Sequence, residues 1–211
     1  MRTHISSRGS IALLALALTA CPAAAHHPMG GQTPQTLLHG LLSGLGHPVI
    51  GPDHLAFIVA IGIAAALVPA GIGLIGAFVA ASTCGVLVHL GAIDVPASDT
   101  LVAGSVIAAG ALVAMGRGPG SGVWLGLAVL AGSLHGYAFG EAVVGAEQSV
   151  VGAYLVGLAL VAGSIAVGLM IVTRTMVERA VLSPAHLRTA GVMLGCVGVV
   201  MLAGSLGALA A

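Results

Sequence analysis

Residues 46–54 hold the densest group of side chains in the sequence that could coordinate a metal ion. They read Gly-His-Pro-Val-Ile-Gly-Pro-Asp-His, which places His47 close to Asp53 and His54. Imidazole and carboxylate groups suit divalent transition metals. An uncharged apolar run, residues 55–68, follows at once. Ionisable groups beside such a run are costly in a bilayer and indicate function, so we expect these three residues to bind a metal ion.

Two prolines divide this stretch. Pro48 and Pro52 each lack a backbone donor and disrupt a helix that reaches them from the N-terminal side. Pro52 suits the first position of a new helix, and Asp53 suits its first turn. We predict helices over residues 36–45 and 52–67, with unwound backbone from one proline to the other that lets the histidines converge on one ion. In the alternative, Asp53 is only a local hydrogen-bond acceptor at the helix start.

The composition is typical of an integral membrane protein. Hydrophobic residues make up 58% of it, charged residues 6%, and the mean hydropathy is +1.14, whereas soluble domains carry roughly 25% charged residues. The net charge is zero and lysine is absent, which argues against a nucleic-acid partner. Three cysteines define no disulfide framework. No phosphate-binding loop is present, so we expect no ATP use by this chain and no permanently bound cofactor.

Residues 1–25 have the features of a cleavable signal peptide. Two arginines precede a short apolar run, residues 11–20, and three alanines ending at Ala25 fit the cleavage rule. Cleavage there would leave His26 as the first residue. Two alternatives remain open: a lipid anchor on Cys21, whose flanking residues resemble a lipobox, and an uncleaved anchor helix.

The rest of the chain, residues 26–211, is predicted to form one all-α integral membrane domain with six transmembrane helices. The six apolar runs approach the roughly 17–25 residues that a crossing needs. They cover residues 52–67, 71–90, 101–116, 122–140, 150–173 and 187–209. Glycine pairs four residues apart should let these helices pack closely. The pairs are Gly122 and Gly126, Gly136 and Gly140, and Gly191 and Gly195.

The charges give this arrangement an orientation. If the signal is cleaved, the mature N-terminus is periplasmic, and four arginines fall inside or at the inner edge: Arg117, Arg174, Arg179 and Arg188. This agrees with the positive-inside rule. Seven of the eight mature histidines then lie on the outer side. Histidines scattered through a core would not gather on one side. The asymmetry therefore favours an outward-facing vestibule in which the histidines collect cations.

A second group of candidate ligands lies near the outer end of the fourth run. His135 and Glu141 could add an imidazole and a carboxylate to the same metal site. Alternatively, His135 is a buried side chain hydrogen-bonded to a neighbouring helix. Other outer residues are candidates for secondary metal capture, although a solvated loop or a disordered end would explain some of them equally well. They are His26, His27, His39, His89 and Asp99.

At these residues the sequence resembles the HupE/UreJ family of nickel permeases. Residues 47–54 carry the family's His-x5-Asp-His signature, and residues 135–141, His-Gly-Tyr-Ala-Phe-Gly-Glu, resemble its motif in the fourth span. Residues 96–106 resemble the start of its third span. A cleavable signal and six helices agree with the family architecture, so the resemblance covers nearly the whole chain.

The resemblance implies uptake of Ni²⁺, or in some members Co²⁺, across the bacterial inner membrane to supply a metalloenzyme such as hydrogenase or urease. Metalloenzyme maturation proteins are then expected downstream partners. His47, Asp53 and His54 would be the signature metal residues, with His135 and Glu141 supporting them. Two departures bear on metal selectivity. Phe139 stands where many relatives have a second histidine, and Asp99 stands where glutamate is expected.

We therefore expect a permease rather than an enzyme, moving a divalent cation inward through a site of incomplete coordination. Metal affinity should fall below about pH 6, because a protonated imidazole cannot ligate. Two rival hypotheses remain. One is an intramembrane zinc-dependent hydrolase using the same histidines and Asp53. The other is a metal-binding accessory protein that transports nothing.

Overall fold

The computed structural model describes residues 32–116 and 119–210, and this part of the chain is helical without strands. The predictions for the signal peptide, Cys21, His26, His27 and Arg117 lie outside the described residues. The elements are α2 (Leu37–Ile50), α3 (Pro52–Leu67), α4 (Gly71–Leu90), α5 (Ser98–Ala114), α6 (Ser121–Gly140), the short 3₁₀ helix η2 (Glu141–Val143), α7 (Gln148–Glu178) and α8 (Pro184–Ala210). Each of the six apolar runs is helical, and α3 and α4 have the predicted bounds.

Four of these helices are long and apolar enough to cross a membrane, namely α4, α6 with η2, α7 and α8. The pair α2 and α3 meets the same criteria only when taken together as one span bent by 78°. Helix α5 is apolar but has 17 residues, which makes it about 26 Å long at 1.5 Å per residue, slightly less than a bilayer core. The structure therefore confirms an all-α multi-pass membrane protein with four to five candidate spans.

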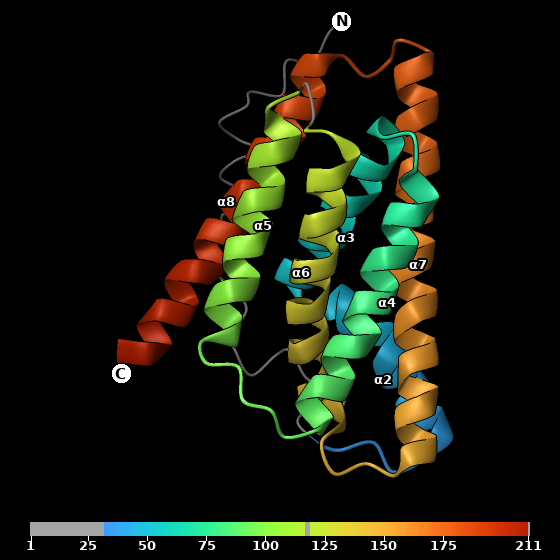
Figure 1. Cartoon of the computed structure of the whole chain (residues 1–211), viewed down its shortest axis with the longest axis vertical. Coiled ribbons are helices and arrows are strands. Elements are labelled where there is room, and N and C mark those ends of the chain that lie inside the picture. The colour runs from blue at the N-terminus through green and yellow to red at the C-terminus, as the bar shows by residue number, and fades with distance from the viewer. Residues whose placement is uncertain (1–31, 117–118, 211) are drawn as a thin grey trace, which may run out of the picture.

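Helix α3 is the centre of the bundle. Its sequence has no polar face beyond its first turn, and a helix that is apolar all round must be buried. The structure agrees, since Phe57, Ile58 and Ile61 are fully buried. Helix α3 packs against α4, α5, α7 and α8, and Figure 1 shows it surrounded by the longer helices. His54, in the first turn of α3, is accordingly buried within the protein.

The break before α3 is shorter than predicted. Helix α2 continues through Pro48 to Ile50, and Gly51 alone, with φ −77° and ψ 111°, separates it from α3. The prediction of unwound backbone from Pro48 to Pro52 was therefore wrong. Pro48 removes only the one backbone hydrogen bond that its own N–H would have donated, and α2 ends two residues later at Ile50. The Gly51 N–H bonds the carbonyl of His47 at 3.2 Å, which completes the last turn of α2.

Two of the three predicted glycine pairs lie at close helix contacts. A Cβ at Gly136 would overlap the backbone of Ser82 in α4, and one at Gly191 would overlap the backbone of α5. The prediction for Gly122 and Gly126 was wrong, because a Cβ at either would meet no atom within 4 Å among the described residues. The spacing is the same in all three pairs, but only the pairs at Gly136 and at Gly191 face a neighbouring helix among the described residues.

Among the described residues, the arginines lie at one end of the bundle, and most of the acidic residues lie at the other, with Glu178 as an exception at the arginine end. Figure 1 shows the ends of α3, α5 and α7 gathered at the top, and the α4–α5 and η2–α7 connections at the bottom. Arg174, Arg179 and Arg188 belong to the top end, where α7 ends and α8 begins. Asp94, Asp99, Glu141 and Glu147 belong to the bottom end. The predicted asymmetry of charge is thus present in the described residues.

Candidate metal centre

Three histidines from three separate helices meet in the interior. His47 lies in the last turn of α2, His54 in the first turn of α3, and His135 in α6. Their side chains are 3%, 4% and 0% exposed, respectively. The bend at Gly51 is what lets His47 and His54, seven residues apart, face one another, with ring centroids 5.6 Å apart. The predicted convergence of His47 and His54 is present, and His135 joins them from a distant part of the chain.

His54 and His135 form the closest pair. Their Nδ1 atoms are 2.8 Å apart and share a hydrogen bond, and their ring centroids are 5.0 Å apart. Two nitrogens bound to one ion at about 2.1 Å and at right angles would be separated by about 3.0 Å. The two imidazoles therefore already have nearly the spacing of adjacent ligands. In the described residues no group of three or more His, Cys, Asp or Glu side chains is arranged to hold a metal ion, so the structure shows a pair of adjacent imidazoles and no complete coordination shell.

Aromatic rings hold the imidazoles in place. Phe57 stacks on His135 with centroids 4.5 Å apart and planes at 29°. Phe139 contacts His54 and His47, with centroids 4.2 Å and 5.1 Å away. These apolar walls exclude water, which strengthens electrostatic interactions at the nitrogens. The three imidazoles are thus enclosed among apolar side chains in the interior of the protein.

Two hydroxyl groups complete the surroundings. The Tyr154 hydroxyl of α7 lies 2.9 Å from Nδ1 of His47, and Oγ of Ser105 in α5 lies 3.0 Å from Nε2 of His135. Both hydroxyl-bearing residues are buried. His135 is therefore hydrogen-bonded to a neighbouring helix, α5, as the alternative interpretation predicted. This hydrogen bond does not exclude metal binding by His135. Outer hydrogen bonds of this kind are the usual way of orienting a histidine ligand.

The family model for HupE / UreJ protein matches residues 14–201. This match spans most of the sequence. The chain belongs to the HupE/UreJ family. It is a family of permeases and accessory proteins with roles in nickel or cobalt transport or in urease and hydrogenase systems, and it is not a family of enzymes. Neither the curated proteins nor the solved structures contain a match to this chain.

The two carboxylates of the predicted site occupy different surroundings in this HupE/UreJ protein. Oδ1 of Asp53 accepts the backbone N–H of His54 at 2.8 Å, which is the local role that the sequence left open. Asp53 is half-buried beside the histidines. Glu141 is exposed at the first residue of η2, beyond the end of α6. Metal binding by either carboxylate remains a prediction.

The three predicted capture residues within the described part of the chain do not join the cluster. His39 and Asp99 are exposed in the first turns of α2 and α5. His89 is half-buried at the end of α4, with its ring 4.4 Å from that of Tyr137, and both line an open pocket together with Asp94. A solvated vestibule is compatible with these positions, and capture of metal there remains a prediction.

Sequence reasoning missed Tyr154 and gave Ser105 no role. Tyr154 is 107 residues from His47, so no spacing rule connects them. One signal was available: the chain has only two tyrosines, and a tyrosine in an apolar span needs a partner for its hydroxyl. Each of the two lies against a histidine, Tyr154 at His47 and Tyr137 at His89.

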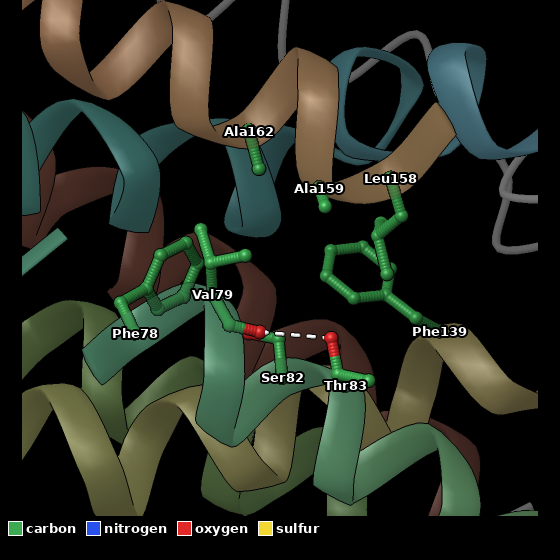
Figure 2. A pocket seen from close by; sticks show the side chains of 8 residues that line it. All are labelled: Phe78, Val79, Ser82, Thr83, Phe139, Leu158, Ala159 and Ala162. Carbon is green, nitrogen blue, oxygen red and sulfur yellow. Dashed lines mark hydrogen bonds between the residues drawn. The ribbon is translucent and has the colours of Figure 1, made fainter. Parts of the chain in front are cut away.

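A small cavity lies directly behind Phe139. Figure 2 shows Phe139 facing Leu158 of α7 across from Ser82 and Thr83 of α4. Thr83 donates its hydroxyl to the carbonyl of Val79 at 3.0 Å, whereas the buried Oγ of Ser82 has no hydrogen-bond partner in the described part of the chain. Phe139 therefore separates the histidines from a space that contains an unsatisfied polar atom.

Gly51 is predicted to be essential for the position of His54. A Cβ at Gly51 would lie 2.6 Å from Cδ2 of His54, so alanine would turn the imidazole away from His135. We expect Gly51→Ala to weaken Ni²⁺ binding on the order of tenfold, measured by isothermal titration calorimetry of purified protein. Gly152→Ala in α7, where a Cβ would meet nothing within 4 Å, is the matched control. Equal affinities for both variants would contradict this account of Gly51.

Proposed function

We propose that this HupE/UreJ protein carries a divalent transition-metal ion, Ni²⁺ or Co²⁺, inward across the bacterial inner membrane to supply a metalloenzyme such as hydrogenase or urease. The observation that carries the proposal is the convergence of three imidazoles inside an otherwise apolar bundle. Polar side chains are expensive at such a place and mark substrate pathways in membrane proteins. Imidazole nitrogen, in turn, suits Ni²⁺ and Co²⁺.

We further propose six spans. Four helices qualify alone, the bent pair α2–α3 supplies a fifth, and the short helix α5 supplies a sixth. An arginine-bearing cytoplasmic end and an acidic periplasmic end then follow from the positive-inside rule. The mature N-terminus and the start of α2 would be periplasmic. Acidic residues at that end would raise the local concentration of cations before they enter.

The imidazole pair of His54 and His135 would replace part of the water shell of the ion. Remaining positions would be filled by His47, by Asp53 or by water, which keeps binding loose enough for release. All three histidines are enclosed in this structure, so entry and exit of the ion require other conformations. The single-residue break at Gly51 resembles the broken helices that transporters use at substrate sites.

Metal flux into sealed vesicles tests the proposal. Purified protein in liposomes that contain a nickel-sensitive dye should give saturable Ni²⁺ influx, and Co²⁺ in the outer solution should compete. Protein-free liposomes and liposomes carrying the His54→Ala variant provide the controls. Metal binding without influx would instead assign an accessory role, and it would reject transport by this chain.

A further inference from the structure

Two hydroxyl groups beside the histidines each face a backbone carbonyl as well as an imidazole. Tyr154 OH is 2.8 Å from the carbonyl of Phe139 and 2.9 Å from Nδ1 of His47. Ser105 Oγ is 2.7 Å from the carbonyl of Val102 and 3.0 Å from Nε2 of His135. A hydroxyl has one proton to donate, and a carbonyl can only accept. Where each hydroxyl proton goes therefore decides which nitrogen of each imidazole carries a proton.

For Tyr154 the proton goes to the carbonyl of Phe139. That carbonyl lies in the last turn of α6, where regular intrahelical partners run out, and Phe139 is only 1% exposed. If the Tyr154 hydroxyl donated to His47 instead, the buried carbonyl of Phe139 would lose the hydroxyl as its hydrogen-bond donor, which is unfavourable. Both distances lie within hydrogen-bonding range, so the hydroxyl makes both contacts at once. Tyr154 then accepts from His47, whose Nδ1 is the protonated nitrogen and whose Nε2 carries the lone pair.

For Ser105 the hydroxyl proton goes to the carbonyl of Val102 in the same helix, α5. A serine in a helix commonly donates to a carbonyl three or four residues before it, and 2.7 Å to the carbonyl of Val102 fits O–H···O, whereas 3.0 Å to His135 fits N–H···O. Ser105 therefore accepts from Nε2–H of His135. The lone pair of His135 is left on Nδ1, which is the atom 2.8 Å from Nδ1 of His54.

We propose that Tyr154 and Ser105 are positioning residues that select the tautomers of His47 and His135, so that Nε2 of His47 and Nδ1 of His135 are the nitrogens offered to the ion. This inference rests on the proposed function for the identity of the ion, but the tautomers themselves are a property of the protein without metal. Fixing the tautomer of a histidine ligand through its other nitrogen is how outer hydrogen bonds tune metal sites.

His54 completes the pattern. Because Nδ1 of His135 carries a lone pair, Nδ1 of His54 must carry the proton of the hydrogen bond that joins the two rings. An ion that bound both of these nitrogens would displace that proton to solvent. In the protein without metal, His47 and His54 are therefore both protonated on Nδ1, and His135 on Nε2.

Nitrogen NMR of the metal-free protein tests this assignment. Protein with ¹⁵N-labelled histidine rings, in detergent at about pH 8 where imidazole is neutral, shows protonated and unprotonated ring nitrogens far apart in chemical shift. We expect Nδ1–H at His47 and Nε2–H at His135 in the wild type. In Tyr154→Phe, His47 should lose its Nδ1–H form. An Nε2–H form of His47 in the wild type, or an unchanged tautomer in Tyr154→Phe, would overturn the proposal.

Metal affinity gives the second readout. Tyr154→Phe and Ser105→Ala should each weaken Ni²⁺ binding by about 10- to 100-fold, and Ser105→Thr, which keeps the hydroxyl, should restore most of it. Tyr137→Phe is the matched control, because Tyr137 accepts the backbone N–H of Val95 at 3.1 Å and its ring lies against His89. Wild-type affinity in Ser105→Ala would overturn the role of Ser105. Absence of Ni²⁺ flux with the expected tautomers would reject transport and leave the positioning inference standing.

Discussion

Replacing His135 with phenylalanine is expected to reduce Ni²⁺ uptake into proteoliposomes by more than about 100-fold, because the ion loses a ligand rather than an outer contact. Phenylalanine keeps the planar ring that stacks on Phe57 but removes both nitrogens. One of these faces His54 at 2.8 Å and the other faces Ser105 at 3.0 Å. The variant thus removes the chemistry of the site while retaining most of its packing.

The control for this variant is His186→Phe. His186 is exposed at the opposite end of the bundle, where Nδ1 contacts Ser183 of the same turn. We expect this variant to retain uptake within about twofold of wild type, since surface changes have small effects on stability. Equal loss of uptake in both variants, or none in His135→Phe, would show that His135 is not a ligand.

Replacing Gly136 with valine is expected to destabilise the protein by about 3 kcal/mol or more, at or above the upper end of the usual cost of overpacking. A Cβ at this position would overlap the backbone of Ser82, and backbone atoms cannot rotate away as a side chain can. Helices α4 and α6 would have to separate, and His135, the preceding residue, would move with α6. Thermal unfolding in detergent measures the loss of stability, and uptake should fall in parallel.

Gly126→Val is the matched control for this second prediction. It lies in the same helix, and a Cβ there would meet nothing within 4 Å among the described residues. Valine is well tolerated on a lipid-facing surface, so the unfolding temperature should stay close to that of wild type. If both variants unfold at the same temperature, the close contact of α4 and α6 is not what holds the bundle together.

Local features of the sequence were enough to place α3 and to predict that His47 and His54 lie close together. Pro52 followed by Asp53 and an uninterrupted apolar run predicted the start and end of the central helix, because proline and a carboxylate favour a helix start. The same stretch indicated that His47 and His54 would face one another. His135 was placed in the site because it carries a polar group within an apolar span.

Other features depend on tertiary packing and could not be predicted. The unwound segment around Gly51 was predicted too long, because a proline removes one hydrogen bond but does not by itself end a helix. The contact of Tyr154 with His47 depends on the packing of α7 against α2, which no spacing in the sequence shows. The failure at Gly122 and Gly126 has the same cause, since a four-residue glycine spacing says nothing about which face meets a neighbour.

X-ray absorption spectroscopy of the purified protein loaded with one equivalent of Ni²⁺ counts the imidazole ligands of the bound ion. We expect at least two imidazole ligands in the wild type, and fewer in His54→Ala and His135→Phe. A shell made only of oxygen in the wild type, or an identical imidazole count in all three proteins, would contradict this expectation.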